Sequence, residues 1–347
     1  MHAMIWEGVN RLRWEADMPE PACPAGWVKV RVMSAGVCST DVHIIKGKFD
    51  LVEPPALLGH EICGVVEQVG DNVEGFSNGD RVVVETVVSC GKCVYCRTGR
   101  KHLCTEAKEI GLSEYAGGFA QYVSVPAGCL HRIPDAMSYD EGGILEAMVC
   151  PFGAIYRLGM RMHETVLIQG TGIAGLSFLQ TVKCFSPATV IVAARNPSRL
   201  EQAKRFGADA VINTREENLE ERVHALTGGA GVSLSIDAAG APQTIERAVT
   251  LTAKGGRCIL YGLPEDGADI RFPVKDMILR EITVTGVTNN ELAWEPLMQM
   301  AADGKINVRD MVTHIFPLSQ LARAVDLTQE HPDGLIKAVV HPWDEIA

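Results

Sequence analysis

Basic residues are the minority charge in this sequence, and long apolar runs are missing from it. The 347 residues contain 32 Lys and Arg against 43 Asp and Glu, a formal net charge of −11, with no block of basic residues. That balance disfavours nucleic acid and anionic membranes as partners. No apolar run approaches the roughly 20 residues that cross a bilayer. The first residues lack the basic and apolar regions of a signal peptide. These absences predict a cytoplasmic protein.

Internal repeats, low-complexity tracts and long linkers are also absent from the sequence. Its length suggests two domains, at roughly 150 residues per domain. The 47% apolar fraction and the 34 glycines suit a turn-rich globular protein with a large core. Disulfides persist mainly in oxidising compartments, so the eleven cysteines are expected to be metal ligands or reduced thiols.

The chain changes character near residue 150. Residues 1–140 carry short strand-like runs broken by Gly, Pro and Asp, among them 28–32, 64–69 and 81–84. Residues 165–287 instead alternate strands, expected at 166–169, 190–193, 210–212, 234–237, 258–261 and 282–285, with helices, expected at 174–185 and from the 196–198 cap to 206. That alternation predicts a doubly wound parallel sheet of the Rossmann type. The tail is expected to form helices at 292–303 and 318–328 and a strand at 338–340.

Four cysteines on one loop form the strongest chemical signal. Their spacing is C-x2-C-x2-C-x7-C, and they are Cys90, Cys93, Cys96 and Cys104. Four thiolates can close a tetrahedron around a metal ion, and zinc prefers that geometry with no open position. The competing iron–sulfur pattern is C-x2-C-x2-C-x3-C-P, but here the last gap is longer and Thr105 replaces the proline. Chance clustering and disulfides explain the spacing less well, so it predicts a structural zinc site.

A glycine-rich turn opens the α/β region. The run Gly170-Thr171-Gly172-Ile173-Ala174-Gly175 is G-x-G-x-x-G, directly after an expected strand and before an expected helix. Gly170 permits the tight turn, Gly172 allows close approach of a pyrophosphate, and Gly175 allows helix and strand to pack closely. The N–H groups at Ile173 and Ala174 open the helix and favour an anion. An ordinary βα turn is the alternative, but this context favours a dinucleotide site.

The end of the second strand of this region indicates which dinucleotide is bound. An NAD site usually has Asp or Glu about 20 residues past the glycines, to bind the ribose 2′-hydroxyl. This chain instead has Ala193-Ala194-Arg195-Asn196, with Arg199 following. Arg195 is suited to stack on adenine or to bind a 2′-phosphate, and Arg199 to assist. Alternatively, both arginines are surface charges of the next helix. The pattern favours NADP(H) over NAD(H).

Scattered polar residues suggest a second metal site. A catalytic zinc needs three protein ligands and one open position. Cys38 and His60 are suitable ligand types, and Glu146 or Cys150 is the candidate for the third. If this segment is helical, the four-residue spacing of Glu146 and Cys150 puts both on one face. Each residue alone is weak evidence, but together with the two preceding motifs they predict a catalytic zinc.

At this point the chain resembles the zinc-dependent medium-chain alcohol dehydrogenases, and within them the polyol (sorbitol-type) dehydrogenases. The resemblance covers nearly the whole chain. It rests on the runs C-S-T-D-V-H, L-G-H-E, C-G-K-C-V-Y-C-R-T-G, G-G-F-A-Q-Y-V, G-T-G-I-A-G, R-E-I-T-V-T-G-V and V-T-H-I-F-P-L, in that order. It implies a GroES-like β-rich catalytic domain with both zinc sites over residues 1–151, a Rossmann domain over 152–288, and a return of 289–347 to the catalytic domain.

The same resemblance implies the metal ligands. Cys38 and His60 would bind the catalytic zinc, and Asp41 would hydrogen-bond the far nitrogen of His60 and orient it. Glu61 would be a conditional ligand. Polyol and threonine dehydrogenases carry Glu-Pro at the position of Glu146, whereas simpler alcohol dehydrogenases place a cysteine in a frame that fits Cys150. Here an alanine follows the glutamate, so the choice between Glu146 and Cys150 stays open. Glu146 is favoured, because the run Glu146-Ala147-Met148 also resembles the secondary-alcohol enzymes, which use a carboxylate at this position. Two zinc ions per chain are expected.

Proton transfer and substrate binding are implied for further positions. Thr40 matches the hydroxyl that receives the alcohol proton, and His43 the histidine that relays it to solvent. Arg280 matches a basic residue near the metal and the cofactor. The polyol enzymes have an aromatic residue and then Arg-Tyr where this chain has Thr288-Asn289-Asn290, so the expected substrate is an unnamed secondary alcohol, polyol or matching ketone.

Two other functions remain alternatives. A zinc-free quinone or enone reductase shares this fold, but usually lacks the cysteine loop and the metal triad. A non-catalytic NADPH-binding relative would have lost the metal site, whereas Cys38, Thr40 and His60 are all present. The expected partner is a small-molecule alcohol or ketone. A homo-oligomer is expected, with a tetramer favoured over a dimer.

Overall fold

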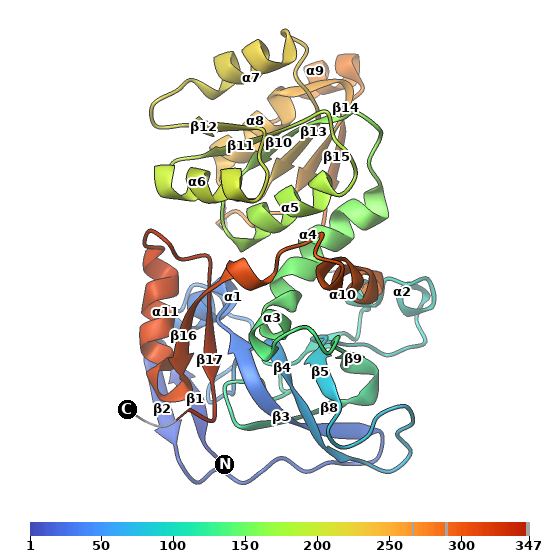
Figure 1. The fold of residues 1–347 in the computed structure, drawn as a ribbon, viewed down its shortest axis with the longest axis vertical. Helices are drawn as coiled ribbons and strands as arrows, with labels where there is room; N and C mark the ends of the chain where they lie inside the picture. The colour runs from blue at the N-terminus through green and yellow to red at the C-terminus, as the bar shows by residue number, and fades with distance from the viewer. Residues whose placement is uncertain (266, 289–290, 345–347) are drawn as a thin grey trace. The chain divides into compact units, whose positions relative to one another are not determined.

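The computed structural model describes residues 1–265, 267–288 and 291–344, and the chain forms two compact units. The first unit comprises residues 1–147 and 294–347, and the second comprises residues 148–293. Figure 1 shows the red C-terminal strands β16 and β17 beside the blue N-terminal strand β3 within the first unit. Among the described residues, none of the helices combines the length and the apolar character that crossing a membrane requires.

The first unit is built on a seven-stranded sheet. The strand order is β16 (Val312–Pro317), β17 (Lys337–His341), β3 (Trp27–Gly36), β4 (Glu61–Val69), β5 (Arg81–Val84) and β9 (Leu130–Arg132), with β8 (Tyr122–Pro126) also paired to β3. The strands predicted at 28–32, 64–69, 81–84 and 338–340 are therefore confirmed. β17 pairs with β3 antiparallel and brings the C-terminal tail to the N-terminal strands.

Alternation explains why β3 forms and which face it buries. Val28, Val30 and Val32 are fully buried, whereas Lys29 and Arg31 between them are partly exposed. Successive side chains of a strand point to opposite faces, so the valines pack into the core of the first unit. The other elements of this unit include a hairpin of β1 (Ala3–Gly8) and β2 (Arg11–Glu15), and the helices α1 (Ser39–Ile45), α2 (Val94–Arg97), α3 (Tyr139–Gly143), α10 (Trp294–Ala302) and α11 (Leu321–Glu330).

The second unit is a six-stranded parallel sheet. Its order is β12 (Ala210–Asn213), β11 (Thr189–Ala194), β10 (Thr165–Gln169), β13 (Val232–Asp237), β14 (Thr252–Leu260) and β15 (Thr283–Gly286). The chain therefore moves outward from β10 to one edge and then to the other, as in a doubly wound fold. Its helices are α5 (Ile173–Lys183), α6 (Pro197–Arg205), α7 (Leu219–Thr227), α8 (Pro242–Thr250) and α9 (Val274–Arg280). The six predicted strands are all present, with ends shifted by a few residues.

One helix crosses the boundary between the units. α4 (Leu145–Leu158) begins in the first unit and continues into the second, with Pro151 inside it. In the tail, the helix predicted at 292–303 is a 3-10 turn (Glu291–Ala293) followed by α10, and the helix predicted from 318 begins as a 3-10 turn (Leu318–Gln320) before α11. α4 therefore gives Glu146 and Cys150 the helical spacing that the sequence left conditional.

Candidate active site

The four-cysteine loop folds into a lobe with zinc-like geometry. The Sγ atoms of Cys90 and Cys96 lie 3.9 Å apart, and those of Cys93 and Cys96 lie 3.5 Å apart. All four ligand atoms, including that of Cys104, lie within 4.8 Å of one another. A tetrahedral zinc with bonds of about 2.3 Å separates its sulfur ligands by about 3.8 Å. The lobe therefore fits a structural zinc ion.

Backbone N–H groups point at the thiols of this lobe. The amide of Cys93 donates to Cys90 Sγ at 3.4 Å, and that of Cys96 donates to Cys93 Sγ at 3.5 Å. A hydrogen bond from Ser89 lowers the pKa of the Cys96 thiol to about 7, and the amides of Lys92 and Cys93 lower the pKa of Cys90. All eleven cysteines are free thiols. The backbone amide of Cys90 lowers the pKa of the fourth thiol, Cys104, but burial and the neighbouring thiols outweigh it and raise that pKa to about 11. The lowered pKa values favour thiolates, the form that binds a metal, at Cys90 and Cys96.

A second cluster of ligands forms where β3 ends and β4 begins. Cys38 caps the N-terminus of α1, and His60 and Glu61 stand at the start of β4. One ligand atom from each of these three residues lies within 4.8 Å of the others, and His60 is only 4% exposed. The structure brings together Cys38 and His60, the two ligands named from the sequence. Glu61, expected there as a conditional ligand, lies in the same group.

Asp41 organises this cluster from the first turn of α1. Its Oδ1 lies 3.3 Å from His60 Nδ1 and accepts a hydrogen bond from the amide of Gly59 at 3.2 Å. Its Oδ2 accepts one from the amide of Cys38 at 3.1 Å. Asp41 is fully buried, so these contacts satisfy a charge that water cannot reach. With Nδ1 facing Asp41, the Nε2 of His60 is the nitrogen available to a metal.

Glu146 approaches the other side of His60. Its Oε2 lies 4.0 Å from His60 Nε2, which does not exceed the roughly 4.0–4.4 Å that two zinc–ligand bonds of about 2.0–2.2 Å can span. Burial raises the pKa of Glu146 to about 7, with His60 opposing that shift. Cys150, one turn further along α4, is a buried residue of the second unit. A cation beside Glu146 would stabilise its charged form, so its position fits the third ligand.

Lys337 is a site residue that the sequence analysis missed. Its Nζ donates to Glu61 Oε1 at 2.6 Å, and the two side chains are 5% and 0% exposed. Burial opposes the charge of Lys337, but Glu61 raises the pKa of the lysine. In the described part of the chain, Glu61 Oε2 has no hydrogen-bond partner. An unsatisfied buried carboxylate oxygen next to Cys38 and His60 fits a cation between them.

The two predicted proton carriers lie on α1. Cys38 Sγ is 3.7 Å from Thr40 Oγ1, so the Thr40 hydroxyl is beside the metal ligands. His43 is one turn further along the helix, and its ring meets the edge of Phe49 at a centroid distance of 4.7 Å. α1 therefore places Thr40 beside the ligand Cys38 and His43 one helical turn after Thr40.

The glycine turn of the second unit has the geometry of a pyrophosphate site. Gly170 has φ of +112°, which favours glycine, and a Cβ on Gly175 would lie 2.1 Å from the carbonyl oxygen of Gly170. Gly172 caps the N-terminus of α5, and a Cβ there would meet nothing within 4 Å. Open space in front of the N–H groups of Ile173 and Ala174 fits the anionic part of a dinucleotide.

Arg195 and Arg199 lie at the same edge of the sheet as this turn. The amide of Gly170 donates to the carbonyl of Ala193 at 3.0 Å, and the exposed Arg195 follows two residues later, at the end of β11. Asn196 caps α6 by accepting a hydrogen bond from the amide of Ser198 at 2.9 Å. Arg199 is on the first turn of α6.

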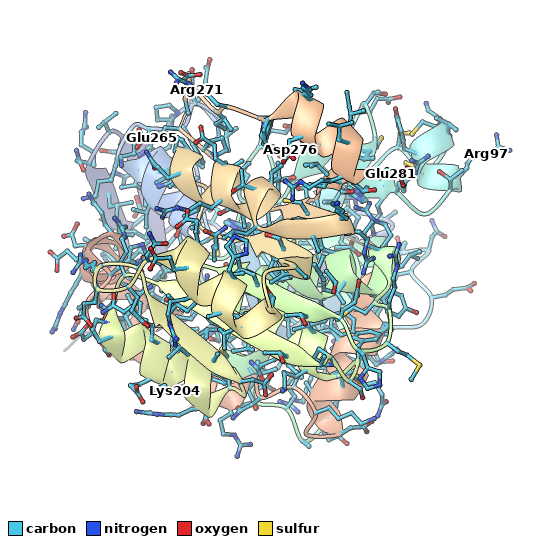
Figure 2. The ribbon with its side chains drawn as sticks, turned by 90° about the horizontal axis from the view of Figure 1, so that it is seen from above. Arg97, Lys204, Glu265, Arg271, Asp276 and Glu281 are labelled. Carbon is cyan, nitrogen blue, oxygen red and sulfur yellow. The ribbon has the colours of Figure 1, made fainter. Side chains whose placement is uncertain are left out.

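Arg280 does not lie at the edge of the sheet that carries the glycine turn. It ends α9, where its Nε donates to Asp276 Oδ2 at 2.8 Å and its Nη1 donates to the carbonyl of Thr252. Figure 2 labels Asp276 on this helix. Thr252 begins β14, at the amino-terminal edge of the sheet, whereas dinucleotides bind outside the carboxyl ends of the strands. The role predicted for Arg280 beside the cofactor is therefore withdrawn. Asn289 and Asn290 lie outside the described residues.

Comparison with known proteins identifies the family. The alcohol dehydrogenase GroES-like domain matches residues 24–135, and the zinc-binding dehydrogenase model matches residues 170–303. The chain is 30% identical to the sorbitol dehydrogenase of Bacillus subtilis over 99% of its own length and 97% of that protein. The chain belongs to the zinc-dependent medium-chain alcohol dehydrogenases. The predicted fold class and the predicted oxidoreductase activity are confirmed.

Two further relatives of this medium-chain dehydrogenase are informative. It is 32% identical to the D-arabitol-phosphate dehydrogenase of Enterococcus avium, with 90% of each chain covered. A structure of an alcohol dehydrogenase from Escherichia coli, solved with NADH, matches with a TM-score of 0.91 at 31% identity and covers 98% of this chain and 99% of that one. Zinc and a nicotinamide dinucleotide are thus the cofactors of the family, and both fit the residues of this dehydrogenase.

Two glycine variants of the dehydrogenase should separate folding from cofactor binding. Gly175→Ala places a methyl group 2.1 Å from a carbonyl oxygen, and should lower the free energy of unfolding by about 1–3 kcal/mol. Gly172→Ala adds a methyl group in open space, and should leave stability within about 0.5 kcal/mol while weakening dinucleotide binding about tenfold, because the methyl obstructs the pyrophosphate. Urea unfolding and cofactor titration measure both. Equal cofactor affinity in Gly172→Ala and the wild type would contradict this site.

A pair of contacts from His341 to Asp140 and Asp344, called here the histidine clamp, makes stability pH-dependent. His341 Nε2 lies 2.6 Å from Asp140 Oδ1 on α3, and its Nδ1 lies 3.0 Å from Asp344. The hydrogen bond with Asp140 raises the pKa of His341. Its stabilisation is therefore fully present below the unfolded pKa of about 6.5 and is lost as pH rises through the folded pKa. Urea unfolding should show His341→Gln less stable than wild type near about pH 6, with the difference shrinking above neutrality. A constant difference would contradict the clamp.

Proposed function

We propose that the protein oxidises a secondary hydroxyl group of a polyol or a related alcohol, or reduces the matching ketone, by hydride transfer with NADP(H). The observation that carries this is the cluster of Cys38, His60 and Glu61, with Asp41 beside Nδ1 of His60 and Glu146 4.0 Å from its Nε2. The names of the relatives, sorbitol and D-arabitol-phosphate dehydrogenase, support a polyol as the substrate class.

Cys38, His60 and Glu146 would hold the catalytic zinc, with Glu61 at the fourth position when no substrate is present. Bound there, zinc supplies a Lewis acid that lowers the pKa of an alcohol, while the dinucleotide supplies the hydride acceptor. Asp41 fixes the ring of His60 so that Nε2 faces the site. Lys337 holds one oxygen of Glu61 and limits how far that carboxylate can move. Cys90, Cys93, Cys96 and Cys104 would hold the structural zinc.

Thr40 would accept the proton that leaves the substrate hydroxyl and pass it to His43. The Thr40 hydroxyl is 3.7 Å from Cys38 Sγ, at the ligand end of α1. An imidazole titrates near neutrality, which suits a proton relay at the working pH. His43 is partly exposed, so it can deliver the proton to solvent. Thr40→Val should therefore remove most of the activity while zinc stays bound.

NADP(H) is proposed over NAD(H) from the chain around β11. Ala194 stands where a carboxylate would repel a 2′-phosphate, and the exposed Arg195 and neighbouring Arg199 supply positive charge. Arg195→Ala should raise the KM for NADP about tenfold, since a hydrogen bond to a charged group contributes about 1.5–3 kcal/mol, and should leave the KM for NAD nearly unchanged. An equal effect on both cofactors would refute this preference.

The proposal also includes a homo-oligomer and a cytoplasmic location. α9, which packs against β14, exposes Val274, Ile278 and Leu279 at 61%, 69% and 71%. Apolar side chains exposed together support a homo-oligomer, for which we favour a tetramer over a dimer. Light scattering measures the mass of the assembly. The eleven free thiols support the cytoplasm as its compartment.

The direct test is turnover by zinc-loaded protein, followed through the absorbance of the reduced nicotinamide. Polyols, secondary alcohols and their ketones are each assayed with NADP(H) and with NAD(H). Turnover of a polyol with a clear NADP(H) preference supports the whole proposal. A preference for NAD(H) refutes the cofactor choice alone. Silence across the panel, with two zinc ions bound per chain, refutes the substrate class.

A further inference from the structure

A small pocket of the first unit lies between α1 and α11, outside the zinc-ligand cluster. Its volume is about 200 Å³, which is below the roughly 300–1,000 Å³ of sites that enclose a whole ligand. A water occupies about 30 Å³ of the liquid, so the pocket has room for one compact group with some solvent. Its polar lining consists mainly of Ser39, His43, Lys46, Lys48, Thr328 and His331.

The lining carries positive charge in an acidic protein. Two lysines, two histidines and the hydroxyl of Ser39 border the pocket, and none of its lining residues is acidic, although the chain has a net charge of −11. The hydroxyl of Thr328, which also borders it, donates to the carbonyl of Ala324 at 2.8 Å. Lys46 is also paired with Asp326, at 2.8 Å from Oδ1, just outside this lining. Ammonium, imidazole and hydroxyl donors converging on one small space are the groups that bind phosphate oxygens.

Helix ends explain only part of this charge. α1 ends at Ile45 and α11 at Glu330, and the carbonyl groups at a helix C-terminus favour nearby cations. Lys46 and His331 are the C-cap residues of these helices, so they have that second role. Lys48 lies beyond the end of α1, so the helix C-terminus does not explain its charge. The helix ends also do not explain why the basic groups surround an open pocket. An anion is the ligand that this arrangement accommodates.

The pocket lies along α1, the helix that Cys38 caps. Ser39, directly after the ligand Cys38, borders the pocket together with His43 and Lys46 from the same helix. At about 1.5 Å per step, the seven steps from Ser39 to Lys46 span roughly 10 Å. A polyol chain of several carbons can bridge that distance, with a hydroxyl at the metal end and a terminal group in the pocket.

We propose that this pocket binds a phosphate group, and that the substrate is a polyol carrying a terminal phosphate. The inference rests on the proposed function, which it narrows from polyols to polyol phosphates. The 32% identity to a D-arabitol-phosphate dehydrogenase is consistent with it. The same chemistry would accept a phosphate of the dinucleotide or free phosphate, so the test must separate these sources.

The experiment uses zinc-loaded full-length protein and the variant Lys48→Gln, which removes one pocket charge. Lys254→Gln, an exposed lysine at the start of β14 in the second unit, is the control for charge removal. Arabitol is compared with arabitol phosphate, and sorbitol with sorbitol phosphate, by steady-state kinetics. Binding of inorganic phosphate is measured separately by calorimetry, so the pocket is tested even without turnover.

We expect kcat/KM to be higher for each phosphate ester than for its parent polyol. Lys48→Gln should lower kcat/KM for the esters about tenfold by raising KM, because charge-assisted hydrogen bonds to phosphate are lost. Lys48→Gln should also weaken inorganic phosphate binding, and Lys254→Gln should change neither. Equal use of esters and polyols, with Lys48→Gln without effect, overturns the inference and leaves the proposed function standing.

Two other outcomes also decide the question. A rise in the KM for NADP in Lys48→Gln, with the ester unaffected, assigns the pocket to the dinucleotide and overturns the substrate assignment. Silence with all polyols and esters refutes the proposed function. In that case, phosphate binding that is equal in Lys48→Gln and the wild type overturns the pocket as well.

Discussion

Replacing Cys38 by alanine should remove one of two zinc ions and lower kcat/KM by at least about 1,000-fold. A bound zinc ion contributes several kcal/mol to catalysis, and each 1.36 kcal/mol is about tenfold in rate. Cys38 caps α1 and is the one thiol in the ligand group that it forms with His60 and Glu61, so no other member of this group can replace it. Metal analysis and steady-state kinetics on the same preparation test both effects.

The matched control is Cys23→Ala, which changes a partly exposed thiol whose Sγ donates to the carbonyl of Trp27 at 3.4 Å. It should keep two zinc ions and full activity. Cys96→Ser is the complementary variant, because it should also lose one zinc ion, this time from the structural lobe. Activity in Cys38→Ala within tenfold of the wild type would contradict the assignment of the catalytic metal site.

The second large effect concerns stability. Arg257→Leu should lower the free energy of unfolding by about 3–5 kcal/mol, because it leaves a buried carboxylate without its cation. Arg257 Nη2 donates to both oxygens of Glu164, at 2.8 and 2.7 Å, and Glu164 is only 3% exposed. Arg257 Nη1 also donates to the carbonyl of Gly159 at 2.8 Å, just after the end of α4. Urea unfolding measures the loss.

Two variants give this prediction its controls. Arg222→Ala breaks an exposed ion pair with Glu217, in which the side chains are 45% and 36% exposed, and should cost less than about 1 kcal/mol. The double variant Arg257→Leu with Glu164→Leu removes both charges and should recover most of the stability. If Arg257→Leu costs no more than Arg222→Ala, the buried pair is not the structural element described.

The parts of the fold that could be predicted are those encoded locally. The Gly170–Gly175 turn carries its own geometry, because only glycine tolerates φ of +112° at Gly170 and the close approach of Gly175 to Gly170. The central strands β10 and β11 carry near-continuous apolar runs, as buried parallel strands require. The cysteine lobe is likewise encoded within fifteen residues of sequence, from Cys90 to Cys104.

The parts that could not be predicted depend on distant segments. Lys337 and Glu61 are 276 residues apart in sequence, and a lysine within an apolar run looks like an exposed strand residue until its partner is known. Glu146 and Cys150 share a helical face by spacing, so spacing left both as candidates. The resemblance favoured Glu146, and the 4.0 Å distance to His60 supports it. Arg280 fits a family motif, but its side chain donates hydrogen bonds to Asp276 and to the first residue of β14. It therefore lies at the amino ends of the strands, whereas the glycine turn lies at their carboxyl ends.

The most direct test of hydride transfer by this enzyme uses an isotope. The best polyol substrate is prepared with deuterium on the carbon that bears the reacting hydroxyl, and the reduced dinucleotide is isolated after turnover. Mass spectrometry should find the deuterium in the nicotinamide ring, in an amount equal to the product formed. Reduced dinucleotide without deuterium, alongside oxidised polyol, would contradict direct hydride transfer between substrate and cofactor.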